Sequence, residues 1–190
     1  MQPSDYLEVA FKLSVNDEMK RLIDTQASIT HFEKGTTVLS VGDYSYSSYF
    51  ILSGIVRGYY LDEYGKDVTK CFSAESEFFS TEGFRSNSPS TFTIECLETC
   101  TCVVLPYSLL NELLKQDEQI GGLVRELFQD EVTKQELKNK RLLLQDVKTR
   151  YTAFCQEHPN LLSRIPQKYI ASYLGAAPQS LSRIKKKIVN

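Results

Sequence analysis

The hydrophobic pattern of this 190-residue chain changes at Pro106. Between about Ile29 and Leu105, β-branched and aromatic residues occur in short runs. Glycines about ten residues apart separate the runs, which is the spacing of short strands in a sandwich or barrel. After Pro106 the apolar residues follow the period of a helix instead. We therefore expect an α+β protein in which a β-domain precedes a helical C-terminal part.

Two local signals refine this expectation. Residues 49–72 predict two strands that flank Gly54, followed by a hairpin turn at residues 63–66. Nearer the N-terminus, Ser14 and Asp17 have the spacing of a capping box. We therefore expect a helix to begin at Ser14.

The helical part contains one unusually long segment. After a short amphipathic helix over residues 109–114, apolar residues recur at helical spacing from Ile120 toward Leu144. A helix of about 25 residues is long for such a chain, so its apolar stripe must be covered by its own β-domain or by a second copy of the helix. The second option makes a homodimer, and its interface would contain four residues: Ile120, Leu123, Val124 and Leu127.

Charge is distributed unevenly along the chain. Residues 151–190 hold six Lys and Arg residues and one acid, a net charge of +5, whereas the preceding 150 residues carry −7. An acidic body with a basic C-terminal part favours a module that binds a polyanion. The alternative is a solvated basic terminus without a partner.

The most specific motif is QKYIASYLGAAPQSLSRIKK, residues 167–186. It follows a predicted helix at residues 150–155 and a break at residues 157–160. Ala171 supplies the small residue needed where two helices cross, and Gly175 can adopt the left-handed conformation of the turn. Pro166 and Pro178 lie where helices tolerate proline, near the start. The pattern matches a helix-turn-helix, with an ordinary helical hairpin as the alternative.

A helix-turn-helix places its second helix in the major groove of DNA. Its N-terminal residues then reach base edges, and here these are Gln179, Ser180, Ser182 and Arg183. Glutamine can pair with adenine and arginine with guanine. Lysines on the same two helices are expected to bind phosphates, and these are Lys168, Lys185, Lys186 and Lys187.

Other classes of function find no support. Cys96, Cys100 and Cys102 lack the loop spacing of a zinc site, so we interpret them as buried free thiols and expect no metal and no cofactor. His31 and His158 have no neighbouring nucleophile or acid in a motif, and no phosphate loop or nucleophile elbow occurs, so we do not expect an enzyme. Without a signal peptide or an apolar run of membrane-spanning length, we expect a cytoplasmic protein with no membrane partner.

Taken together, these segments resemble the Crp/Fnr family of transcription regulators. IPQKYIASYLGAAPQSLSRIKKKI is similar to the short-tailed branch common in Bacteroidetes, and KGTTVLSVGDYSYSSYFILSGIVRGYYLDEYGK resembles the first half of the family's cyclic-nucleotide-binding jelly roll. The resemblance implies a jelly-roll domain over residues 1–117, a dimerisation helix over 118–146 and a DNA-binding domain over 147–190. It further implies a homodimer on double-stranded DNA that reads a palindromic operator, with RNA polymerase as a possible partner.

The ligand pocket departs from the family pattern. Nucleotide-binding members carry a Gly-Glu pair for the ribose and an Arg followed by Ser or Thr for the phosphate. Alignment through residues 78–96 puts Phe79 and Ser80 at the first pair, and Ser90 and Thr91 at the second. Because the charge that would neutralise a phosphate is missing, we expect no tight binding of cyclic AMP. The nearby Arg85 is interpreted as a surface arginine, and the effector is unknown. A jelly-roll ligand-binding or scaffold protein without DNA binding remains the alternative function.

Overall fold

The computed structural model describes residues 1–80 and 88–189 of the chain. They form two compact units, Met1–Gly121 and Gly122–Asn190. The first unit contains the predicted β-domain, and the second contains only helices among its described residues.

The β-domain consists of two antiparallel four-stranded sheets. The strand order is β1-β8-β3-β6 in one sheet and β2-β7-β4-β5 in the other. This is the jelly-roll architecture, so the predicted α+β fold class is confirmed. The strands are β1 Ser28–Phe32, β2 Thr37–Leu39, β3 Ser47–Ser53, β4 Val56–Leu61, β5 Asp67–Ser73, β6 Phe78–Phe79, β7 Thr93–Cys96 and β8 Cys100–Pro106.

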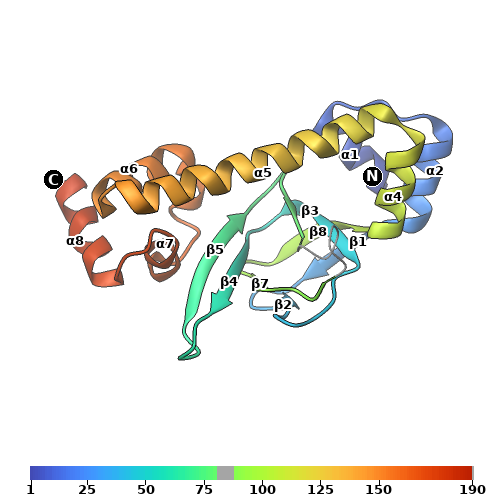
Figure 1. Ribbon diagram of the computed structural model, residues 1–190. Helices are drawn as coiled ribbons and strands as arrows, with labels where there is room; N and C mark the ends of the chain where they lie inside the picture. Colours follow the sequence, from blue (N-terminus) through green and yellow to red (C-terminus); the bar gives the residue numbers. More distant parts are fainter. Residues whose placement is uncertain (81–87, 190) are drawn as a thin grey trace. The chain divides into compact units, whose positions relative to one another are not determined.

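Gly54 marks the point where the chain passes from one sheet to the other. The two strands predicted around it exist, but they are not paired, because β3 belongs to the first sheet and β4 to the second. Gly54 has a φ of +103°, and a Cβ there would lie 2.7 Å from the Thr99 carbonyl oxygen, so the crossing requires glycine. The predicted hairpin turn is confirmed between β4 and β5 (Figure 1).

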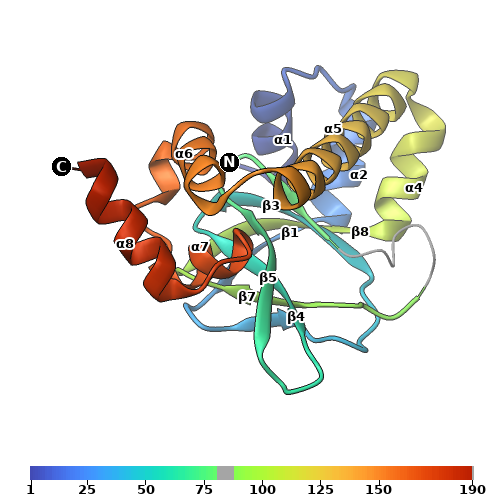
Figure 2. The ribbon, with the colours of Figure 1, turned by 60° about the vertical axis from the view of Figure 1, so that its left-hand side comes forward.

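Among the described residues of the first unit, three helices accompany the sheets: α1 Pro3–Phe11, α2 Asp17–Gln26 and α4 Tyr107–Gln116. Figure 2 shows them at one end of the β-domain. The predicted capping box at Ser14 and Asp17 is wrong. The N-cap of α2 is Asn16, whose side-chain oxygen accepts from the Met19 backbone N–H at 2.9 Å, and Asp17 is the first helical residue. An Asn two residues later than the predicted cap is an equally good cap and leaves Ser14 in the connecting segment.

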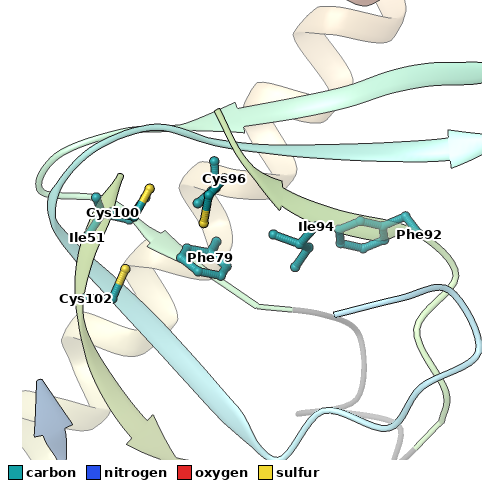
Figure 3. Close-up of a cluster of buried hydrophobic side chains, with 8 residues drawn as sticks. Ile51, Phe79, Phe92, Ile94, Cys96, Cys100 and Cys102 are labelled. Carbon is teal, nitrogen blue, oxygen red and sulfur yellow. The ribbon is translucent and has the colours of Figure 1, made fainter. Parts of the chain in front are cut away.

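The core between the two sheets contains the three central cysteines. Cys96, Cys100 and Cys102 are at most 1% exposed and pack with Ile51, Val56, Phe79, Phe92 and Ile94 (Figure 3). Their interpretation as buried free thiols is confirmed. Burial raises the pKa of Cys102 to about 12, and contact with Cys100 raises that of Cys96, so both remain protonated thiols at neutral pH.

The helical segments predicted after Pro106 are confirmed. The long helix α5 spans Glu118–Leu144, and two residues separate its end from the start of α6. The remaining elements are α6 Val147–Glu157, the 3-10 turn η1 Pro159–Leu161, α7 Gln167–Tyr173 and α8 Pro178–Val189.

Candidate nucleic-acid interface

α7 and α8 are joined by a tight turn centred on Gly175. Gly175 has a φ of +62°, and its N–H donates to the Ser172 carbonyl at 3.0 Å. The next N–H, of Ala176, donates to the Ala171 carbonyl at 2.9 Å. These two bonds form a Schellman motif, which ends α7 and allows α8 to begin at Pro178.

The pair of helices is held by a small apolar core. Ala171 and Leu181 are both fully buried, so the small residue predicted at the crossing lies at the contact between the helices. This core is built from α6, α7, α8 and the segment that precedes α7, and its buried members are Tyr151, Phe154, Ile165, Ile170, Ala171, Leu174 and Leu181.

The predicted base-reading residues lie along α8. Gln179, Ser180 and Arg183 are exposed, and Ser182 is half-buried. Because Leu181 points into the core, helical spacing places Gln179 and Arg183 on the opposite face, one turn apart. The first turn and a half of α8 therefore presents one amide and one guanidinium together to the outside.

The predicted phosphate-binding lysines are exposed as well. Lys186 lies three residues beyond Arg183 and shares its face of α8, followed by Lys187. Lys185 is exposed on the flank of the helix, nearer the side of Leu181. Lys168 lies in the first turn of α7, with its ammonium 4.6 Å from the centroid of the Tyr169 ring.

The structure adds residues that sequence reasoning did not select. Arg150 of α6 donates from Nε to the Leu174 carbonyl at 3.0 Å, beside the Gly175 turn. Arg141 of α5 forms an ion pair with Glu157 of α6, and this bond lowers the pKa of Glu157. No sequence motif marks these contacts, because their partners lie 16 and 24 residues away.

The predicted dimer stripe lies in the first half of α5. Ile120 is only 7% exposed within one chain, so little of its surface is left for a partner. Leu123, Val124 and Leu127 are half-buried. Further along the helix, several large apolar side chains are exposed, including Val132, Leu137, Leu143 and Leu144. These four residues are spread around the helix, so they do not by themselves define a surface for another protein.

At the predicted departures from the nucleotide pocket, two of the described side chains, Phe79 and Ser90, are buried in the core. Phe79 is 6% exposed and its ring stacks on Tyr49 with 4.7 Å between centroids. Ser90 is 3% exposed, and its hydroxyl donates to the Phe92 carbonyl at 2.6 Å. Ser80 is half-buried and Thr91 is exposed, and Arg85 lies outside the described residues. No group of three metal-ligating side chains occurs among the described residues.

One known family matches part of the first unit. Residues 29–117 match the model of the cyclic nucleotide-binding domain. This segment, a little under half of the chain, is therefore similar to that domain. The matched segment covers the eight described strands except the first residue of β1, together with α4.

Similar proteins are regulators. Over 189 aligned residues the chain is 22% identical to the electron transport regulator A of Shewanella oneidensis, covering 93% of this chain and 74% of the relative. FixK2 from Bradyrhizobium japonicum shares the fold with a TM-score of 0.77 at 18% identity, over 85% of this chain and 84% of that one. The c-di-GMP-responsive global regulator CLP from Xanthomonas campestris gives 0.66 at 16% identity, over 91% of both chains. Over most of its length the chain is thus similar to regulatory proteins and shares the fold of FixK2 and CLP.

No helix among the described residues has the length and apolar character needed to cross a membrane.

Proposed function

We propose that this protein is a dimeric transcription regulator that reads a palindromic operator with α8. The observation that carries the proposal is the outer face of α8, where Gln179, Arg183 and Lys186 lie together around a helix anchored by the buried Leu181. Arginine and glutamine are the side chains best suited to guanine and adenine edges, and lysine to phosphate. No acidic side chain occurs in α7 or α8.

The proposal assigns a role to each part of the chain. Residues 1–117 form the sensor, 118–146 the dimerisation helix and 147–190 a helix-turn-helix domain. Gln179, Ser180, Ser182 and Arg183 read bases. Lys168, Lys185, Lys186 and Lys187 bind phosphates. Leu123, Val124 and Leu127 supply the dimer contact, with Ile120 at its edge.

We also propose where such a regulator works and which molecules it contacts. It binds double-stranded DNA in the cytoplasm and contacts RNA polymerase at its promoters. It has no enzymatic activity. The resemblance of residues 165–188 to the Bacteroidetes-type branch supports an assignment to that branch.

A gel shift tests the proposal. The purified protein is titrated onto a duplex from upstream of its own gene, and onto a duplex of the same length and composition with scrambled order. We expect a retarded complex on the first duplex at concentrations that leave the second free. Equal retardation of both, or of neither, would favour a jelly-roll ligand-binding or scaffold protein without sequence-specific DNA binding.

Arg183 and Lys186 should differ in the kind of effect they have on DNA binding. Changing Arg183 to Ala should cost about 1–3 kcal/mol on the operator and relax the preference at one base pair of each half-site. Changing Lys186 to Ala should weaken operator and random DNA to the same extent and reduce the salt dependence. Titrations of both variants on both duplexes at several salt concentrations separate these results. If the two variants lose affinity in parallel for all sequences, Arg183 binds phosphate and the base-reading role falls to Gln179 and Ser180.

Cyclic AMP and cyclic GMP should not stabilise the protein. Phe79 occupies the position where nucleotide-binding relatives carry glycine, and Ser90 offers no positive charge and already donates to the Phe92 carbonyl. A ligand present at 100 times its dissociation constant stabilises a fold by about 2.7 kcal/mol, which a thermal scan detects readily. We expect an unchanged melting temperature with either nucleotide at about 1 mM, and an upward shift would contradict this reading of the pocket.

A further inference from the structure

We propose that Arg150 is a positioning residue that fastens the α7–α8 pair to the C-terminal end of α5. Its guanidinium donates from Nε to the Leu174 carbonyl at 3.0 Å and from Nη1 to the Gln145 carbonyl. Leu174 is the C-cap of α7, and Gln145 directly follows the last residue of α5. One side chain on α6 therefore binds the carbonyl ends of two other helices.

This use of an arginine has a clear physical basis. The last carbonyls of a helix have no partner within the helix, and they carry the negative end of its dipole. A guanidinium is permanently charged and holds its donors in a rigid plane, so it can satisfy two carbonyls at a fixed separation. A lysine ammonium in the same place offers one centre of donors on a flexible stem.

Other contacts lie at the same joint, by which we mean the place where the C-terminal end of α5 adjoins α6 and the α7–α8 pair. Leu142 of α5 approaches the Gly175 turn, where a Cβ would lie 3.1 Å from its Cδ2. The Lys138 ammonium lies 4.2 Å from the centroid of the Tyr173 ring. Arg141 and Glu157 tie α5 to α6. All of these residues belong to the compact unit Gly122–Asn190. The end of α5 and the α7–α8 pair are thus joined at several points, with Arg150 bonded to both sides.

The consequence concerns the distance between two DNA half-sites, and it rests on the proposed function. If two α5 helices form the dimer, each α8 is carried at the end of a dimerisation helix. Two such helices can read two half-sites only when their separation and rotation match those of the DNA. A joint that is held by Arg150 fixes this separation. Without the guanidinium each α8 gains freedom to swing, and the dimer tolerates half-sites at other spacings.

Spacing preference is therefore the measurement. The wild-type protein first selects its half-site from random duplexes. Two copies of this half-site are then placed as an inverted repeat, with their centres from about 8 to about 13 base pairs apart in one-base-pair steps. The range surrounds the spacing of about 10 base pairs that separates neighbouring major grooves on one side of DNA. Affinity is measured for the wild type, for Arg150→Gln and for Lys148→Gln. Lys148 is an exposed cation on the same helix, so Lys148→Gln removes the same charge and leaves both helix ends bound.

We expect the wild type and Lys148→Gln to prefer one spacing over its neighbours by about tenfold or more, and Arg150→Gln to prefer it by less than about threefold. The affinity of Arg150→Gln for a single half-site and its dimeric state should not change. A merely structural role would lower affinity at every spacing in parallel, and that result would overturn the proposal.

Arg150→Lys is a second variant, and it tests the positioning role of Arg150 if Arg150→Gln does not fold. It keeps the charge but not the planar pair of donors, so its spacing profile should also flatten. A wild-type profile in either folded Arg150 variant contradicts the positioning role while the proposed function stands. Failure of the wild type to select any half-site would instead overturn the proposed function, and the positioning role with it.

Discussion

The double substitution Leu123→Glu and Leu127→Glu should convert the protein to a monomer and reduce its affinity for the operator by about 100-fold or more. The two residues lie one turn apart on α5 and are half-buried. A dimer interface would bury both carboxylates without a partner, which costs several kcal/mol. Linking two readers gives the second half-site an effective concentration in the millimolar range, and a monomer loses that advantage.

Light scattering and DNA titration measure the two effects separately. The matched control is Gln129→Glu with Thr133→Glu, which adds the same two charges one turn apart at exposed positions of α5. This control should remain a dimer and bind the operator with no more than a small electrostatic loss. A wild-type protein that is monomeric at micromolar concentration would contradict the proposed interface.

Replacing Arg57 with Met should lower the free energy of unfolding by about 2–3 kcal/mol. Arg57 is fully buried, and donates to the Thr69 hydroxyl at 2.9 Å, to Asp67 at 2.8 Å and to Glu95 at 2.9 Å. Burial opposes its charge, but the two carboxylates hold its pKa above the ordinary value. Removing the guanidinium leaves two like charges facing each other, and solvent around the 42%-exposed Asp67 side chain moderates the loss.

Denaturant unfolding measures this loss. Arg21→Met, at an exposed position of α2, should stay within about 0.5 kcal/mol of the wild type. Adding Glu95→Gln to Arg57→Met should recover part of the stability, because it removes one of the two carboxylates that repel each other in the single variant. If Arg57→Met alone is as stable as the wild type, the contacts of Arg57 with Asp67 and Glu95 do not hold β4, β5 and β7 together.

The features predicted correctly from sequence are those set by neighbouring residues. The hairpin between β4 and β5, the extent of α5 and the left-handed Gly175 all follow from local spacing and from the conformational freedom of glycine. The start of α2 was misplaced because Ser14 and Asn16 both satisfy the requirements of an N-cap, and only the hydrogen bond to Met19 distinguishes them.

Two arginines that hold elements of the fold together could not be predicted from local sequence patterns. Arg57 meets its partners only through the register of β4 with β5 and β7. Arg150 acts on carbonyls of the backbone, which leave no mark in a sequence. Both are arginines whose partners are distant along the chain, and composition alone would place them at the surface.

Selection from a random duplex library by the purified full-length protein tests the central claim most directly. The account predicts that the recovered sequences contain an inverted repeat with half-site centres about 34–36 Å apart, as two α8 helices of one dimer require. Recovery of an unrepeated motif, or of no motif beyond general base composition, would contradict a dimeric regulator that reads a palindromic operator.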